Sequence, residues 1–318
     1  MNTVRNHLDD PLIMAKSISV LFPALQAVFN IMCFRVYSTR IQYITFEMIA
    51  FCELLKPYEE AIVQQYIDKC MYFYGGSICW IYLSCFFVMT GPLTLDQPFP
   101  TNAEYPFDVY YQPLKTIVFL QQNMACLQGA AQLCMNIFMG LLMWFTSARF
   151  ELLVVKLRIV TDIYALRKCI QEHQSLLKYT EEVIAIVRLI AVTTVWFTTI
   201  VLIIVGLILI TDQPLLMKIQ CVGIVFSGLS IVFMFTWPAE HLIHISNEVG
   251  QAVFDARWYY QQSIILRKDM LILMMRAQQP VTVSIPCVMP SLSLSYYATF
   301  LSTIFSYFTT LRIVMQQD

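Results

Sequence analysis

Six long stretches of this 318-residue chain contain no Asp, Glu, Lys or Arg, and they constrain its fold more than any other feature. They are residues 17–34, 70–95, 116–148, 189–211, 219–239 and 277–311. A helix needs roughly 20 apolar residues to cross a bilayer, and one charge at the bilayer centre costs about 2.5–3.5 kcal/mol. The pattern therefore predicts an all-α membrane protein with six transmembrane helices.

The composition agrees with this fold class and excludes several functions. Hydrophobic residues make up 58% of the chain and charged residues 13%, against about 25% charged residues in an average soluble domain. The net charge of -1 gives no basic surface for nucleic acid, so we expect no nucleic-acid partner. Because the sequence contains neither a catalytic constellation nor a glycine-rich phosphate loop, we predict no enzyme activity and no cofactor.

The basic residues predict the orientation in the membrane. Fifteen of the 20 Lys and Arg residues lie in the segments that follow the first, third and fifth stretches. Cytoplasmic segments carry the Lys and Arg excess. Both termini are therefore expected on the extracellular side.

Apolar residues continue at helical spacing beyond two of the predicted spans, among charged residues. They are Phe150, Val154, Leu157 and Val160 after the third stretch, and Val249, Val253, Trp258 and Ile265 after the fifth. Amphipathic helices in water must bury such stripes. We predict a cytoplasmic helical bundle that could also hold subunits together.

The sixth stretch is too long for one span, and Pro280, Pro286 and Pro290 interrupt it. Proline breaks regular helix. We predict a helix that ends near Gln279, an irregular hinge, and a spanning helix over residues 293–314. We therefore divide the chain into residues 1–248, which hold the first five spans with their cytoplasmic extensions, and residues 249–318, which hold a cytoplasmic helix and the last spanning helix.

One face of this last helix carries hydroxyl groups. Ser302, Ser306, Thr309, Thr310 and Ile313 share a side, and Leu301, Phe305, Phe308 and Leu311 lie opposite. The hydroxyls could bond to carbonyls four residues earlier or pack on a neighbouring helix. Alternatively, this face lines an aqueous pore, which would discriminate weakly among cations because it has no fixed charge.

A small organic ligand needs a concave apolar site with a few polar groups. The outer halves of the spans supply candidates, for each of which ordinary packing is the alternative: Ser17, Leu21, Trp80, Ser84, Phe87, Phe119, Gln122, Asn123 and Cys126. The proline- and aromatic-rich segment between the second and third spans is predicted to fold over them as a lid.

A possible metal motif does not have the required spacing. Glu240 precedes His241 and His244, which are three residues apart, whereas a zincin motif places a glutamate between histidines four apart. We therefore predict a plain helix-end cluster and no metal site.

The C-terminal third resembles the insect odorant receptor family. The similarity is carried by residues 276–280 (RAQQP), 293–295 (SLS) and 306–312 (SYFTTLR), with residues 248–250 (EVG) and 257–259 (RWY) upstream. The resemblance implies seven spans, of which the first is absent because residues 10–45 look like the second. It also implies a heterotetramer with a shared co-receptor, in contact with membrane lipid, in the plasma membrane of a sensory neuron dendrite.

The same resemblance implies roles for particular residues. Volatile odorants would bind in the outer half of the bundle, and the gate of a central cation pore would lie near Thr310, Ile313 and Val314. Trp258, Arg276, Gln278 and Pro280 would anchor subunits to one another.

Three alternatives remain open at this stage. Gustatory receptors share the architecture. A G-protein-coupled receptor lacking one span would place its C-terminus inside the cell, against the charge pattern. A transporter would be expected to contain internal repeats and a buried charge within a span.

Overall fold

The structure is a computed structural model, and it describes residues 11–94, 99, 108–109, 111–160, 162–211, 215–256, 264–285 and 289–315. Eight helices are present in these ranges: α2 (Pro11–Val36), α3 (Ser38–Glu53), α4 (Pro57–Thr94), α5 (Leu114–Arg158), α6 (Ile163–Ile210), α7 (Leu215–Asp255), α8 (Ile264–Ala277) and α9 (Leu294–Met315). The all-α prediction is confirmed.

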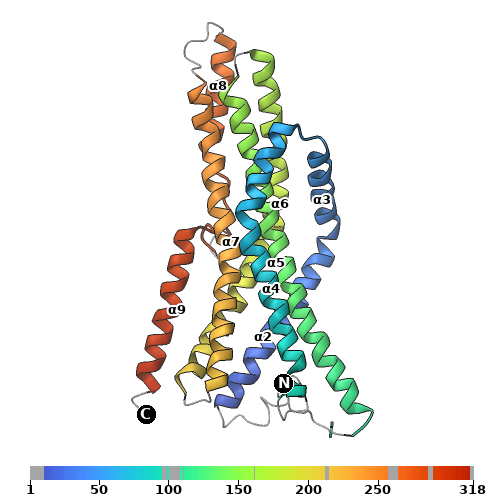
Figure 1. The fold of residues 1–318 in the computed structure, drawn as a ribbon. Helices are drawn as coiled ribbons and strands as arrows, with labels where there is room; N and C mark the ends of the chain where they lie inside the picture. The colour runs from blue at the N-terminus through green and yellow to red at the C-terminus, as the bar shows by residue number, and fades with distance from the viewer. Residues whose placement is uncertain are drawn as a thin grey trace.

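The helices form an elongated bundle in which α5, α6 and α7 run along the long axis (Figure 1). Helix α5 packs along α7, α4 packs against α5, and α2 packs against α6. The start of α2, the end of α6, the start of α7 and the end of α9 lie at one end, and α8 lies at the other (Figure 1). Segments predicted to share one side of a membrane thus lie at the same end of the molecule.

Four helical segments are long and apolar enough to cross a membrane: Pro57–Pro92, Leu114–Arg158, Ile163–Ile210 and Lys218–Asp255. Helices α2 and α3 meet at a bend of 70° and would make a fifth if the pair is one span. Helix α9 has a suitable length but is not in this set, because its many Ser, Thr and Tyr side chains lower its mean hydropathy. The membrane fold is confirmed, whereas the six predicted spans correspond to four or five by this measure.

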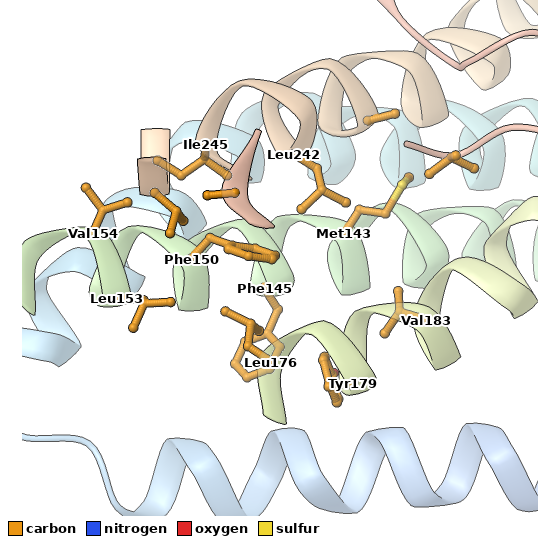
Figure 2. Close-up of a cluster of buried hydrophobic side chains, with 14 of the residues drawn as sticks. Met143, Phe145, Phe150, Leu153, Val154, Leu176, Tyr179, Val183, Leu242 and Ile245 are labelled. Atoms are coloured by element: carbon orange, nitrogen blue, oxygen red, sulfur yellow. The ribbon is translucent and has the colours of Figure 1, made fainter. Parts of the chain in front are cut away.

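The largest core lies where the helices extend beyond their uncharged stretches. Figure 2 shows side chains of α5, α6 and α7 that converge there, including Phe150, Tyr179 and Leu242. The stripe predicted from Phe150, Val154, Leu157, Val160, Val249 and Val253 is buried in this core. Ile265 does not join it, because that side chain is 57% exposed. Trp258 lies outside the described residues.

A buried ion pair joins α3 to α5 beside this core. Arg149 Nη1 lies 3.0 Å from Glu47 Oε1, and the two side chains are only 11% and 25% exposed. The guanidinium also lies over the rings of Phe51 and Tyr179, at 4.7 and 4.6 Å from their centroids. Such stacking on two rings stabilises a partly desolvated arginine.

Helices α4, α5 and α7 are in close contact at Gly140. A Cβ atom there would lie 2.5 Å from Tyr74 Oη and 3.1 Å from the Met234 carbonyl oxygen. The Tyr74 hydroxyl donates a 3.0 Å hydrogen bond to that same carbonyl. The absence of a side chain on α5 therefore lets α4 bond directly to the backbone of α7.

Candidate functional site

The last helix has two different faces. Leu301, Ile304, Phe308 and Leu311 are half-buried against α6 and α7. The face with the predicted pore residues is exposed in the protomer: Ser302, Ser306, Thr309, Thr310 and Ile313, the last at 57%. The side chain of Val314 is not among those described. The division into a packed face and an uncovered hydroxyl face agrees with the spacing argument except at Phe305, which was predicted on the opposite side but is 63% exposed. What covers the hydroxyl face in a membrane stays a prediction.

Two of these hydroxyls bond to the helix backbone. The Thr309 hydroxyl donates to the carbonyl of Phe305 at 3.1 Å, and the Thr310 hydroxyl donates to that of Ser306 at 2.9 Å. The local alternative considered for the sequence is thus present. A threonine oxygen that donates its proton still has lone pairs. This face can therefore present oxygen acceptors to water or a cation while its protons stay bonded within the helix.

The start of α9 is fastened to α7. The carboxylate of Glu240 accepts a 3.0 Å hydrogen bond from the backbone N–H of Leu294, and Ser293 Oγ accepts one from the N–H of Tyr296 at 3.0 Å. The first N–H groups of a helix need such acceptors, and a carboxylate also interacts favourably with the helix dipole.

The connector before α9 is held by α7 as well. The Val281 N–H donates to Ser246 Oγ at 3.1 Å, Ile285 and Met289 exchange two backbone bonds, and Leu292 is fully buried. The predicted hinge after Gln279 is therefore confirmed as irregular backbone between two helices. It is docked on α7 rather than free of it.

Removing the carboxylate at the start of α9 should loosen that helix locally. For Glu240→Ala we expect amide hydrogen exchange at residues 294–296 to accelerate about fivefold, which corresponds to the loss of a cap of ~1 kcal/mol. Exchange mass spectrometry on protein in nanodiscs measures this. Glu240→Gln keeps an oxygen acceptor and should give a smaller change. Equal exchange in both variants and the parent would show that the carboxylate does not hold α9.

The predicted ligand residues on α4 face different surroundings. Trp80 Nε1 donates to Ser227 Oγ of α7 at 3.2 Å, and the Trp80 ring lies edge-on to Phe226. The Ser84 hydroxyl donates to the Trp80 carbonyl at 2.8 Å, and Phe87 is 65% exposed. Trp80 thus faces the outer surface of α7.

The predicted ligand residues on α5 are more enclosed. Gln122 is 6% exposed, and Asn123 and Cys126 are half-buried. The Cys126 carbonyl accepts from the thiol of Cys85 on α4 at 3.4 Å. Phe119 packs beside a small cluster that contains Phe99, which is 4% exposed, whereas Tyr111 of the same predicted lid is 55% exposed. Leu21 is half-buried on α2, and the side chain of Ser17 is not described.

Deeper in the bundle, several amide side chains are buried between helices. Gln26 of α2 donates to Thr194 Oγ1 of α6 at 3.3 Å. Asn30 accepts a 3.3 Å bond from Thr193, while its Nδ2 has no partner among the described residues. Asn136 on α5 is 1% exposed, and both of its amide atoms also have no hydrogen-bond partner among the described residues.

Such amides are unusual inside an apolar bundle, because an unpaired buried polar group is costly. They can hydrogen-bond to a polar group of a small ligand. The ligand residues predicted from the sequence did not include Asn30 and Asn136. The sequence feature that could have identified these two residues is a neutral amide in the middle of an uncharged stretch.

The predicted anchor residues lie at the end of α8. The Arg276 guanidinium donates to the Gln279 side-chain oxygen at 2.9 Å, and Arg276, Gln278 and Pro280 are exposed. Exposed residues are available to a second subunit. No contact within the protomer assigns them that role, so it stays a prediction.

The former metal candidates take part in other contacts. Glu240 caps α9, as described above, and the ring of His241 lies edge-on to Tyr66 and near Trp144. His244 lies 3.5 Å from Glu248. The three side chains thus point to separate partners.

The charged extension of the bundle contains a second ion-pair cluster. Lys156 Nζ lies 3.1 Å from both Glu59 and Glu172. Burial alone would raise the pKa of Glu59, but the Lys56 amide and Lys156 outweigh it and hold that pKa below its usual range. Conversely, burial favours neutral Lys156, and the two carboxylates raise its pKa above the usual value. The cluster therefore stays ionised and ties α4, α5 and α6 together.

Comparisons with known sequences address the identity of the chain. The sequence model of the 7tm Odorant receptor family matches residues 14–305. Odorant receptor Or2 of Anopheles gambiae is 27% identical over 150 residues, covering 47% of this chain and 39% of that protein. Odorant receptor 10 of Aedes albopictus is 27% identical over 149 residues, covering 46% and 39%. The matched part spans less than half the length of these two curated relatives.

The fold is similar to that of a solved insect receptor. The structure of the olfactory receptor OR5 from Machilis hrabei in complex with eugenol aligns with a TM-score of 0.81 at 16% identity, covering 95% of this chain and 81% of that chain. The family match favours the odorant class over the gustatory, G-protein-coupled and transporter alternatives. The family model matches most of this chain, and four of the chain's helices are long and apolar enough to cross a membrane. This multi-pass membrane protein therefore belongs to the 7tm odorant receptor family.

Proposed function

We propose that this chain is an odorant receptor subunit that binds small volatile organic molecules and gates a weakly selective cation pore together with a co-receptor. Its location would be the plasma membrane of a sensory neuron dendrite, with the C-terminus extracellular. The observation that carries this proposal is the division of α9 into a face packed on α6 and α7 and an uncovered face of hydroxyls. In hydrocarbon, such a face needs water or another polar surface.

The ligand would bind among the spans, where the predicted residues of α4 and α5 lie at the outer ends and the buried amides lie deeper. The Machilis hrabei receptor is described in complex with eugenol, a small phenol. A ligand of this kind combines an apolar ring with one or two polar groups. Here Asn30 and Asn136 are suited to a hydroxyl or carbonyl group, and Phe119 to a ring.

Binding would reach the pore through helix packing. The amides of Gln26 and Asn30 connect α2 to α6, and α6 packs on α7 and α9. Helix α7 in turn holds the start of α9 through Glu240. A ligand that fits one arrangement of these helices better than the other shifts the population between closed and open states.

The pore assignment is tested by single cysteines on the two faces of α9. We co-express the chain with a co-receptor, evoke current with an odorant panel that includes eugenol, and apply a cationic methanethiosulfonate reagent. Ser306→Cys, Thr309→Cys and Ile313→Cys should lose most of the evoked current irreversibly, because a charged adduct in a pore repels cations. Phe300→Cys, on the packed side of α9 and outside the residues named for the pore, is the matched control and should keep it.

A tag after Asp318, detected on intact cells, reports surface expression and the predicted C-terminal side in the same experiment. Blockage of both faces alike, or a tag that is reachable only after permeabilisation, would contradict the proposed arrangement. The tag result also separates this channel from a G-protein-coupled receptor.

A further inference from the structure

A cavity of about 190 Å³ lies behind α9, between this helix and α6 and α7. Its wall consists of aliphatic and aromatic side chains and one glycine, and it includes Leu202 and Gly206 of α6, Leu229 of α7, and Phe305 and Phe308 of α9. Among the described residues, no hydroxyl, amide or charged side chain lines it. The cavity therefore offers dispersion contacts and no hydrogen bonds.

Its size and lining define the kind of molecule that fits. An apolar cavity of about 150 Å³ lined by Leu, Ile and Phe stays dry and binds benzene or xenon. The cavity behind α9 is slightly larger and equally apolar. It can hold a one-ring apolar molecule but not a whole lipid chain. Such molecules partition into the membrane. Phe305 lines the cavity and is also exposed on the surface of α9, so a molecule in the membrane can reach the cavity past this residue.

This cavity is separate from the predicted ligand pocket. None of the predicted ligand residues lines it. Helix α7 turns Phe226 and Ser227 toward Trp80 of α4, whereas Val225 and Leu229 line the cavity. A molecule in the cavity would thus lie on the other side of α7 from Trp80.

The contacts around the cavity connect it to the position of α9. A Cβ atom on Gly206 would lie 3.3 Å from Cδ2 of Phe308, so α6 and α9 are already in close contact there. The cavity lies against the packed face of α9, and the hydroxyl face points away from it. A molecule that enters can change how α9 sits on α6 and α7 without touching the hydroxyl face.

We propose that this cavity is a modulatory site for one-ring apolar molecules, distinct from the odorant pocket, and that its occupancy changes the gating of the pore behind which it lies. The site itself depends only on the cavity, whereas its effect on gating rests on the proposed channel function. The ligand class is aromatic hydrocarbons and haloalkanes close to benzene in size.

The site is tested by photolabelling with halothane, whose carbon–bromine bond breaks under ultraviolet light to give a radical that adds to nearby side chains. The protein is purified in nanodiscs, labelled and mapped by mass spectrometry. We expect adducts at the rings of Phe305 and Phe308, to which the radical can add; the displaced hydrogen atom leaves with the bromine atom as HBr. Leu229→Phe fills the cavity and should remove most of them. Ile224→Phe adds the same ring to an exposed position of α7 and should leave them unchanged.

Leu202→Phe serves as a second filling variant if Leu229→Phe does not express. Adducts spread evenly over exposed side chains such as Phe226, or adducts at the cavity that survive both filling variants, would overturn the site. The labelling test measures no current, so its result is valid even if the chain forms no channel.

The modulatory effect is tested with fluorobenzene on odorant-evoked current. In the parent and in Ile224→Phe, fluorobenzene should shift the half-maximal odorant concentration, and in Leu229→Phe the shift should be lost while the odorant response remains. Cavity labelling without any shift in the parent would contradict modulation. Absence of evoked current in every variant would instead contradict the proposed channel function.

Discussion

Gly140→Ala is expected to destabilise the protein by about 1–3 kcal/mol, the range for overpacking a filled core. The added methyl group would lie 2.5 Å from Tyr74 Oη and 3.1 Å from the Met234 carbonyl oxygen. Either the tyrosine moves and its bond to α7 is lost, or α4 and α7 separate from α5. The midpoint of thermal unfolding of the purified protein in nanodiscs measures the change.

The matched control is Gly129→Ala on the same helix. An added Cβ atom at Gly129 meets nothing within 4 Å. Alanine has a higher helix propensity than glycine by about 1 kcal/mol, so this variant should be neutral or slightly more stable. If Gly140→Ala proved as stable as Gly129→Ala, the close approach of α4, α5 and α7 would be wrong.

Arg149→Met is expected to have a still larger effect, about 3–5 kcal/mol, because it leaves one partner of a buried ion pair without compensation. The carboxylate of Glu47 would lose its 3.0 Å partner. The rings of Phe51 and Tyr179 would also lose the guanidinium that lies over them. We expect lower surface expression and a lower thermal midpoint, and Glu47→Gln combined with Arg149→Met should recover part of the loss.

Arg40 supplies the comparison for this experiment. It lies 3.6 Å from Glu182, and the two side chains are 55% and 36% exposed. Surface ion pairs of this kind contribute about 0–1 kcal/mol, so Arg40→Met should change little. Equal losses in the two arginine variants would mean that burial of the Arg149 pair does not stabilise the fold.

The features that the sequence could predict depend on local patterns. The uncharged stretches predicted the spans within α4 to α7. Three prolines predicted the break between α8 and α9. The observed start of α9, at Leu294, differs from the predicted start by a single residue. Helical spacing also placed Ser306 and Thr309 on one face and Leu311 on the other. These signals lie within a few turns of one helix.

The features that could not be predicted join residues distant in sequence. Glu240 caps a helix that begins 54 residues later, and Gln26 bonds to Thr194 across 168 residues. A pattern within one helix does not contain the pairing of helices, so neither partner could be named. Similarly, Ile265 fits the apolar stripe by spacing, but its side chain is 57% exposed.

The attachment of α9 at one end has a mechanical consequence. Directional bonds hold its start, at Leu294, while Phe308 and Leu311 in its distal half face α6 and α7 with apolar side chains. The 22 residues of this helix span about 33 Å at 1.5 Å each. A rotation of roughly 5° at the root would displace the tip by about 3 Å over such a length. A small tilt of α9 at Leu294, where Glu240 holds it, would therefore move Ile313 near the other end by the size of an atom.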